Sequence, residues 1–112
     1  MIKRLKGKKS INQLFKHQKR LAYKPLQLIF KRVNDNDSKI GVSVPKRKVA
    51  LAVNRNRLKR QMREAIRLNP EINQLKYNYH MMWVYHGNSK SYDYKRIYIS
   101  VDKIIKKLKE NE

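Results

Sequence analysis

Residues 53–67 read VNRNRLKRQMREAIR, and they indicate the architecture more clearly than any other segment. Their apolar side chains recur every three or four residues, which predicts a helix over about residues 50–68 with one buried face. The buried face is expected to comprise Leu58, Met62, Ala65 and Ile66. At about 100° per residue, a second arc lies almost opposite this face. It is expected to expose Asn56, Arg60, Arg63 and Arg67.

The segments before this helix predict β-structure. An apolar run at residues 26–33 is typical of a strand, and residues 40–44 alternate between apolar and small side chains with the period of a half-buried strand. The sequence NDNDS between them has turn composition, so the two strands are expected to form an antiparallel hairpin. One more short strand is expected at residues 21–24, and a short helix at residues 10–18.

The segments after the central helix complete an α+β pattern. Residues 79–85, YHMMWVY, predict a strand that is buried on both faces at its centre, with Trp83 in the core. Apolar residues at helical spacing then predict a last helix, with Ser91 as its N-cap. The expected order is α-β-β-(β)-α-β-α in one domain, residues 1–112. Residues 1–9 carry no periodicity and are expected to be a mobile basic arm.

Charge points to the class of partner. The chain has 112 residues, with 29 Lys+Arg against 8 Asp+Glu, which gives a formal net charge of +21. A charge this one-sided favours a polyphosphate, most often nucleic acid, because each cation set against a phosphate releases a condensed counterion. Cysteine is absent, which excludes disulfides and thiolate metal sites. Apolar runs of at most five residues exclude a membrane-spanning helix, and a cytoplasmic location is expected.

Three segments also resemble a known family. Residues 54–67, NRNRLKRQMREAIR, resemble the signature helix of the protein subunit of bacterial ribonuclease P, centred on Arg55-Asn56-Arg57. Residues 39–45, KIGVSVP, resemble the strand that precedes this helix in the family. Residues 4–18, RLKGKKSINQLFKHQ, resemble the family's basic start and first helix.

The resemblance implies a fold and an activity. The implied fold is a small α/β sandwich, similar to a ribosomal-protein domain, with a mostly antiparallel sheet and a left-handed βαβ crossover. The implied function is that of the protein component of a ribonucleoprotein endoribonuclease, which removes the 5′ leader from precursor tRNA. In that family the RNA subunit performs the cleavage with metal ions. Mg²⁺ is therefore expected on RNA phosphates, with none bound tightly by the protein.

The resemblance also implies two binding surfaces. The catalytic RNA is expected to meet Arg55, Asn56, Arg57, Lys59, Arg60, Arg63 and Arg67 of the helix, with Lys46 and Arg47 of the preceding loop. A cleft for the single-stranded leader of precursor tRNA is expected between the sheet and the first helix. Its expected members are Phe15, Ile11, Phe30 and Ser43. Either phenylalanine could instead be an ordinary core residue.

The acidic residues and histidines do not suggest a catalytic site on the protein. The eight carboxylates are scattered, and His17, His80 and His86 have no carboxylate at metal-ligand spacing. No catalytic residue, no metal site and no obligatory protein partner are therefore expected. Two alternatives stay open: a non-enzymatic RNA-binding module, such as a ribosomal or assembly protein, and a polycation that binds anionic membrane surfaces.

Overall fold

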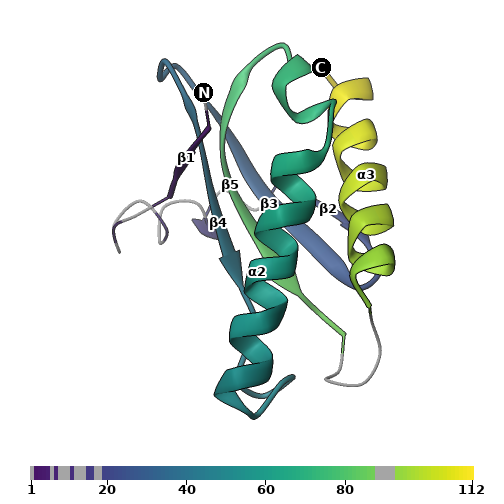
Figure 1. The fold of residues 1–112 in the computed structure, drawn as a ribbon. Coiled ribbons are helices and arrows are strands. Elements are labelled where there is room, and N and C mark those ends of the chain that lie inside the picture. Colours follow the sequence, from purple (N-terminus) through teal and green to yellow (C-terminus); the bar gives the residue numbers. More distant parts are fainter. Residues whose placement is uncertain (1, 6, 8–10, 12–14, 17–18, 88–92) are drawn as a thin grey trace.

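A computed structural model describes residues 2–5, 7, 11, 15–16, 19–87 and 93–112. Two long helices cover one face of a five-stranded sheet (Figure 1). The elements are β1 (Ile2–Arg4), β2 (Lys19–Tyr23), β3 (Leu26–Val33), β4 (Ser38–Ser43), α2 (Ala52–Leu68), a 3-10 turn (Ile72–Gln74), β5 (Asn78–Tyr85) and α3 (Tyr94–Glu110). The predicted strand at 26–33, the extra short strand and the central helix are thus confirmed.

The sheet corrects the predicted hairpin. The strand order is β1-β4-β5-β3-β2, so β5 lies between β3 and β4, and these two strands do not pair. The physical reason lies in β5, whose central residues Met81, Met82 and Trp83 are all buried. A strand buried on both faces is most stable in the middle of a sheet, where neighbours cover both of its edges. The sheet is also mixed rather than mostly antiparallel, with two parallel and two antiparallel pairs.

The connection from β4 through α2 to β5 is left-handed. In Figure 1, β4 runs downward, the chain returns upward through α2 in front of the sheet, and β5 runs downward to the right of β4. Crossovers between parallel strands are right-handed in almost all proteins, because strand twist favours that hand. The handedness expected from the family resemblance is therefore confirmed against the general rule.

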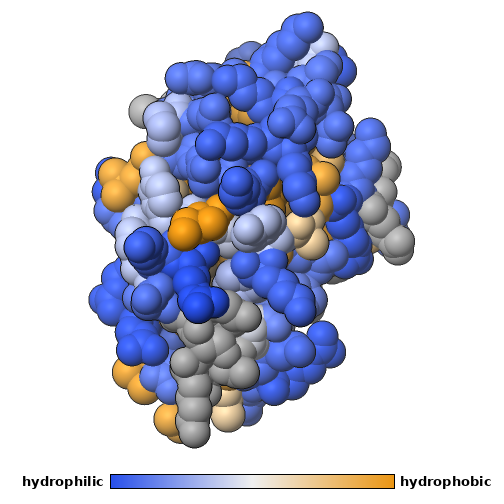
Figure 2. Space-filling view, turned by 90° about the vertical axis from the view of Figure 1, so that its right-hand side faces the viewer, coloured by the Kyte–Doolittle hydropathy of each residue, from blue (hydrophilic) through white to orange (hydrophobic). Residues whose placement is uncertain are grey.

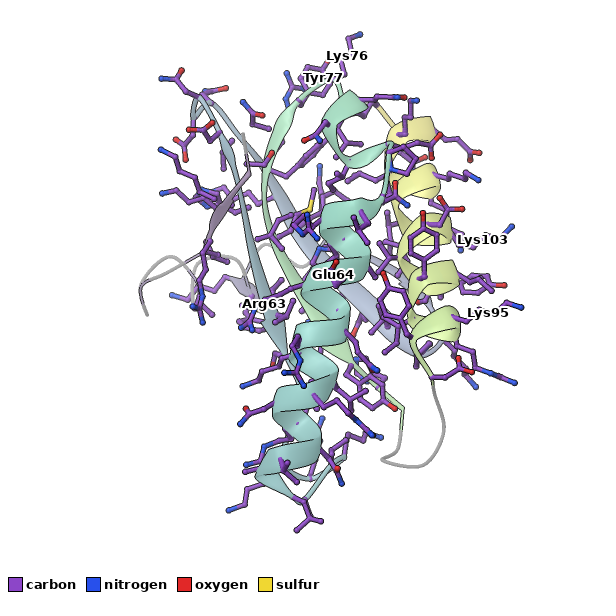
Figure 3. The ribbon with its side chains drawn as sticks, in the orientation of Figure 1. Arg63, Glu64, Lys76, Tyr77, Lys95 and Lys103 are labelled. Carbon is purple, nitrogen blue, oxygen red and sulfur yellow. The ribbon has the colours of Figure 1, made fainter. Side chains whose placement is uncertain are left out.

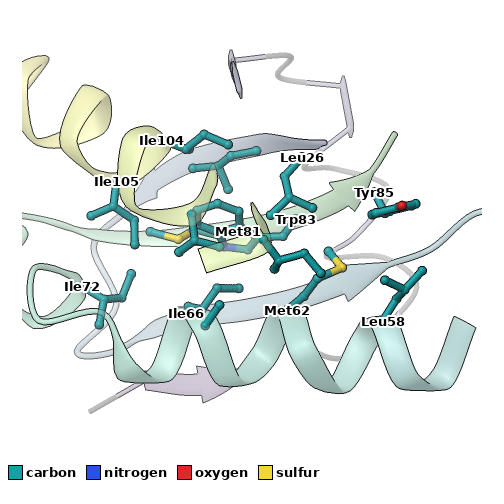
Figure 4. Packing of buried hydrophobic residues seen from close by; sticks show 14 of the residues in the cluster. Leu26, Leu58, Met62, Ile66, Ile72, Met81, Trp83, Tyr85, Ile104 and Ile105 are labelled. Atoms are coloured by element: carbon teal, nitrogen blue, oxygen red, sulfur yellow. The ribbon is translucent and has the colours of Figure 1, made fainter. Parts of the chain in front are cut away.

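The main core lies between the helices and the sheet. Leu58, Met62, Ala65 and Ile66 of α2 are all buried there, as predicted, and Trp83 is fully buried at the centre (Figure 4). The helical face of α3 contributes Ile97, Val101, Ile104, Ile105 and Leu108. This packing orients α2 with its polar arc away from the sheet.

A smaller apolar cluster lies on the other face of the sheet. Leu5, Ile29 and Met82 form it, with Ile11 packed against them. Gly41 of β4 permits this contact, because a Cβ there would lie 2.9 Å from the Met82 Cε atom and 3.5 Å from the Leu5 Cβ atom. The burial of Leu5 anchors the start of the chain against the sheet.

The two ends of the chain depart from the sequence prediction. Residues 2–4 of the expected basic arm form β1, which pairs in parallel with β4, so the expectation of an arm without regular structure is wrong there. The cap of α3 is Asp93, whose carboxylate accepts from the Arg96 backbone N–H at 3.1 Å, and not Ser91. Ser91 lies outside the described residues, as does most of the predicted first helix. Of that helix, Ile11, Phe15 and Lys16 are described, and all three are helical.

Candidate nucleic-acid interface

The outward face of α2 carries a row of cations. Its described side chains follow the predicted arc: the apolar face is buried, and Arg57, Arg60 and Arg63 are exposed. Asn56 and Arg67 are exposed as well, while Lys59 is half-buried. Figure 3 shows Arg63 projecting from α2 on the side of β4. The helix therefore presents guanidinium groups to solvent while its other side is fixed in the core.

This row forms one wall of a groove. Two adjoining cavities, of about 520 and 610 Å³, lie between α2 and the β1–β4 edge of the sheet, and both are lined by Arg4 and Arg63. Ile40 and Ile66 contribute apolar surface to the first cavity. The second is lined by Asn56, Arg57, Lys59 and Arg60. We call the two cavities together the α2 groove.

The opposite wall of the α2 groove was missed by sequence analysis. Lys3 and Arg4 of β1 line it, although both fall in the segment expected to be an arm. The sequence of β1 is only three residues long, so it carries no alternation that could identify a strand. The parallel pairing of β1 with β4 brings these two cations opposite α2.

The cations of the α2 groove are largely unneutralised. In the described part of the chain, no carboxylate lies within ion-pair distance of Arg57, Arg60 or Arg63. Two other cations are paired: Arg67 Nη2 lies 2.6 Å from Glu64 Oε1, and Lys3 Nζ lies 3.2 Å from Asp37 Oδ2. Guanidinium groups without internal partners are suited to bidentate contact with phosphate, because their fork matches two of its oxygens.

Arg55, the first arginine of the signature, is placed differently. Its Nη1 atom donates to the carbonyl oxygens of Ala50 at 2.6 Å and Val49 at 3.1 Å. These carbonyls belong to the loop that connects β4 to α2. The side chain thus fastens the start of α2 to this loop, so the contacts described for Arg55 are with the protein's own backbone.

The β4–α2 loop carries further exposed cations. Lys46, Arg47 and Lys48 are all exposed, and the backbone N–H of Lys48 donates to Pro45 O at 3.0 Å in a tight turn. Burial of Val49 fixes the end of this turn against the core. The structure therefore places Lys46 and Arg47 before the N-terminus of α2, where the positive end of the helix dipole adds to their charge.

Three of the four expected leader contacts are compatible with one surface. Ile11 packs on the second face of the sheet, against Leu5, Ile29 and Met82. Ser43 is the neighbour of Val84, which packs on the same cluster, so Ser43 belongs to that face too. Phe15 is also helical and is 39% exposed. Its exposure favours a binding role over a core role.

Phe30 does not belong to that surface, which corrects the prediction. It pairs with Met81 in the sheet, and both residues pack on the main core under the helices. Its ring meets that of Tyr79 edge to face, with the centroids 5.8 Å apart. Side chains alternate between the two faces along a strand, so Phe30 and the Ser43 surface lie on opposite sides of the sheet.

The described acidic groups have structural partners rather than a common centre. Asp35 Oδ2 lies 3.0 Å from His80 Nε2, and His86 Nε2 lies 2.6 Å from Gln27 Oε1. The hydrogen bond from Lys3 holds the pKa of the Asp37 carboxyl below its usual range. Among the described residues, no group of three or more histidines and carboxylates could hold a metal ion. None of the described helices is long and apolar enough to cross a membrane.

Comparison with protein families gives a match over nearly the whole chain. The family model for ribonuclease P matches residues 2–109. The ribonuclease P protein component of Clostridioides difficile (strain 630) is 32% identical over 105 residues, which cover 94% of this chain and 90% of the relative. That of Clostridium kluyveri is 31% identical over 106 residues, which cover 95% and 94%.

Comparison with solved structures gives the same fold. The ribonuclease P protein of Staphylococcus aureus superimposes with a TM-score of 0.79, at 20% identity, over 95% of this chain and 94% of the other. The protein from Thermotoga maritima also has a TM-score of 0.79, at 21% identity, over 94% and 96%. At 20–21% sequence identity, these superpositions establish the similarity of the fold alone.

Proposed function

The chain belongs to the ribonuclease P protein family, and from this premise we propose that its α2 groove binds the catalytic RNA of a bacterial ribonuclease P. The protein component of this family is part of a ribonucleoprotein endoribonuclease. The observation that carries the proposal is the pair of cationic walls: Arg57, Arg60 and Arg63 on α2 face Arg4 on β1, and no described carboxylate neutralises them.

The geometry of the α2 groove supports a folded RNA as the partner. A single basic helix can bind any polyanion, but a groove with two rigid cationic walls selects a phosphate backbone of suitable shape. Arg55 contributes indirectly, because its bonds to Val49 and Ala50 hold the Lys46–Arg47 loop against the start of α2. The loop and the helix then present their charges as one surface.

The leader of precursor tRNA is assigned to the second face of the sheet. Phe15 is the side chain that would stack on an unpaired base, with Ile11 and Ser43 beside the same sheet surface. Stacking of one base on an aromatic side chain contributes about 1–3 kcal/mol. The helices occupy the other face, so the substrate leader and the catalytic RNA would contact different sides of the protein.

The chemistry of cleavage is assigned to the RNA. Mg²⁺ would supply the activated water and stabilise the leaving oxygen, held mainly by RNA phosphates. The role of the described side chains is to neutralise phosphate repulsion as the two RNAs approach, and no other protein is required. The proposed assembly works in the cytoplasm and not at a membrane surface.

A reconstitution experiment tests the proposal. A bacterial ribonuclease P RNA is assayed for cleavage of precursor tRNA at a Mg²⁺ concentration too low for the RNA alone. Adding the full chain should restore cleavage, because the cations of the α2 groove replace part of the metal in screening phosphates. Cleavage that stays at the level of the RNA alone, with a chain shown to be folded, would refute the assignment.

A further inference from the structure

We infer that a cavity at the β2–β3 edge of the sheet binds one nucleotide of single-stranded RNA, separately from the α2 groove and from the surface around Phe15. The inference rests on the proposed function only in taking RNA as the partner. The cavity has a volume of about 480 Å³ and lies beside the end of α3. Its aromatic and cationic lining comprises Lys19, Arg20, Phe30, Arg32, Tyr77 and Tyr79. We call it the β2–β3 pocket.

Aromatic and guanidinium planes give the β2–β3 pocket surfaces on which a base can stack. The Arg32 Cζ atom lies 3.4 Å from the centroid of the Tyr77 ring, so the guanidinium lies over the face of that ring. Phe30 is half-buried and braced edge to face by Tyr79. Unpaired bases are recognised by stacking on aromatic rings and on guanidinium planes of this kind. Figure 3 shows Tyr77 and Lys76 at the end of the molecule where β5 begins.

The charge around the β2–β3 pocket is suited to the phosphate of the same nucleotide. Lys19 is the direct neighbour of Phe30 in the sheet, and both Lys19 and Arg32 are exposed. In the described residues, neither has a carboxylate within ion-pair distance. Cations next to an aromatic surface are the combination by which proteins hold single strands, with the phosphate outside and the base inside.

The carboxylate that lines the β2–β3 pocket is already engaged. Glu112 Oε1 accepts from the Lys76 backbone N–H at 2.9 Å, and Oε2 accepts from the Tyr79 hydroxyl at 2.7 Å and from the Tyr77 backbone N–H at 3.2 Å. These bonds hold the carboxylate against backbone donors. Glu112 therefore forms part of the pocket wall, and among the described residues it makes no ion pair with Lys19 or Arg32.

The position of the β2–β3 pocket makes it a separate contact. The α2 groove lies at the β1–β4 edge, and three to four strand spacings, about 15–20 Å, separate it from the opposite edge. Phe15 follows Ile11, which packs on the other face of the sheet. The side of the molecule that carries α3 is mostly hydrophilic, with only separated apolar patches (Figure 2), so it favours a polar strand over an apolar protein partner.

Residue-resolved NMR titration with a short RNA tests the inference. The full chain is titrated with the unstructured five-nucleotide RNA AAAAA, and backbone amide shifts are followed. We expect shifts at Lys19, Phe30 and Arg32 that saturate together. Arg32 and Lys19 are exposed, so both can be replaced without disturbing the core. Arg32→Gln and Lys19→Gln should each raise the dissociation constant read from these amides about tenfold, because each variant loses one stacking or phosphate contact. The control Lys103→Gln, on the exposed side of α3, should leave it unchanged.

The same titration contains the result that would overturn the inference. Absence of saturable shifts at the β2–β3 pocket, or an unchanged dissociation constant in both Arg32→Gln and Lys19→Gln, would exclude a nucleotide site there. Amides near Ser43 and in α2 report in the same spectra on the surfaces of the proposed function. Shifts confined to those residues would therefore remove the β2–β3 pocket and leave the proposed function standing.

Discussion

The Arg55 guanidinium donates from Nη1 to the carbonyl oxygen of Ala50 at 2.6 Å, which joins the first turns of α2 to the loop that leaves β4. The N-cap residue, Leu51, has no side chain that could cap the helix. Arg55 does not replace a capping side chain, which would accept from the first N–H groups of the helix; it donates instead to loop carbonyls and so ties the loop to the start of α2. The signature motif of this helix combines one arginine that fixes the loop with others that face solvent.

Replacing Arg55 by alanine should lower stability and leave the salt dependence of RNA binding unchanged. Two charge-assisted hydrogen bonds to the backbone are lost, so the free energy of unfolding in urea should fall by about 1–2 kcal/mol. The logarithmic slope of affinity against salt should stay the same, because the Arg55 guanidinium is already engaged with loop carbonyls. Arg57→Ala is the matched control: it should keep the stability and lower the slope by about one unit. The reverse pattern would make Arg55 an RNA contact.

Replacing Phe15 by alanine should discriminate between two substrates. If Phe15 stacks on the leader, the variant should weaken holoenzyme binding of precursor tRNA about tenfold and binding of mature tRNA, which has no leader, hardly at all. Equilibrium binding of the two RNAs to the reconstituted holoenzyme measures this directly. Equal losses for both substrates would mean that Phe15 serves only the packing of the protein.

The Asp102 carboxylate should give the stability a pH dependence. Partial burial acts to raise the pKa of Asp102, but hydrogen bonds from Lys106 and Asn69 more than offset it and hold this pKa below its ordinary value. The Lys106 Nζ atom lies 2.9 Å and the Asn69 Nδ2 atom 3.0 Å from the carboxylate. A depressed pKa in the folded state stabilises the protein above the unfolded pKa, and this contribution is lost as the pH falls through the folded pKa.

The variant Asp102→Asn isolates this contribution. At pH 7 its free energy of unfolding should lie below that of the unmodified chain by up to about 1 kcal/mol, because Lys106 is half-exposed and solvent screens the pair. The difference should shrink as the pH falls below about 4, where the unfolded carboxyl takes up its proton. Urea unfolding at a series of pH values measures it, with Glu110→Gln as the control for loss of one charge. A difference in the free energy of unfolding that does not change with pH would contradict a stabilising role for the Asp102 carboxylate.

The sequence predicts correctly those helices and strands whose apolar repeat is complete within the element itself. The apolar face of α2 and the run of β3 each carry a repeat that is complete within one element, and both were found where predicted. The cationic arc of α2 follows from the same repeat, because the side opposite a buried face must face solvent. The part of the candidate site that lies on α2 could therefore be predicted from the sequence.

Features that depend on contacts distant in sequence were not accessible in the same way. The hairpin prediction failed because β5, about forty residues beyond β4, inserts between two strands that are neighbours in the chain. Phe30 was assigned to the wrong face because strand alternation gives two faces but does not say which one the helices cover. Lys3 and Arg4 were missed because a three-residue edge strand acquires its place only by pairing with β4.

The most direct measurement of the central claim is the salt dependence of binding to a bacterial ribonuclease P RNA. For the full chain, the logarithm of the affinity is plotted against the logarithm of the salt concentration, and the slope is measured. The same slope is measured for Arg60→Ala/Arg63→Ala and for the control Lys95→Ala/Lys103→Ala, whose two residues are exposed on α3. If the α2 groove holds the RNA, the groove variant should lower the slope by about one to two units. The control should leave the slope unchanged. An unchanged slope in the groove variant, or an equal loss in both, would contradict the account.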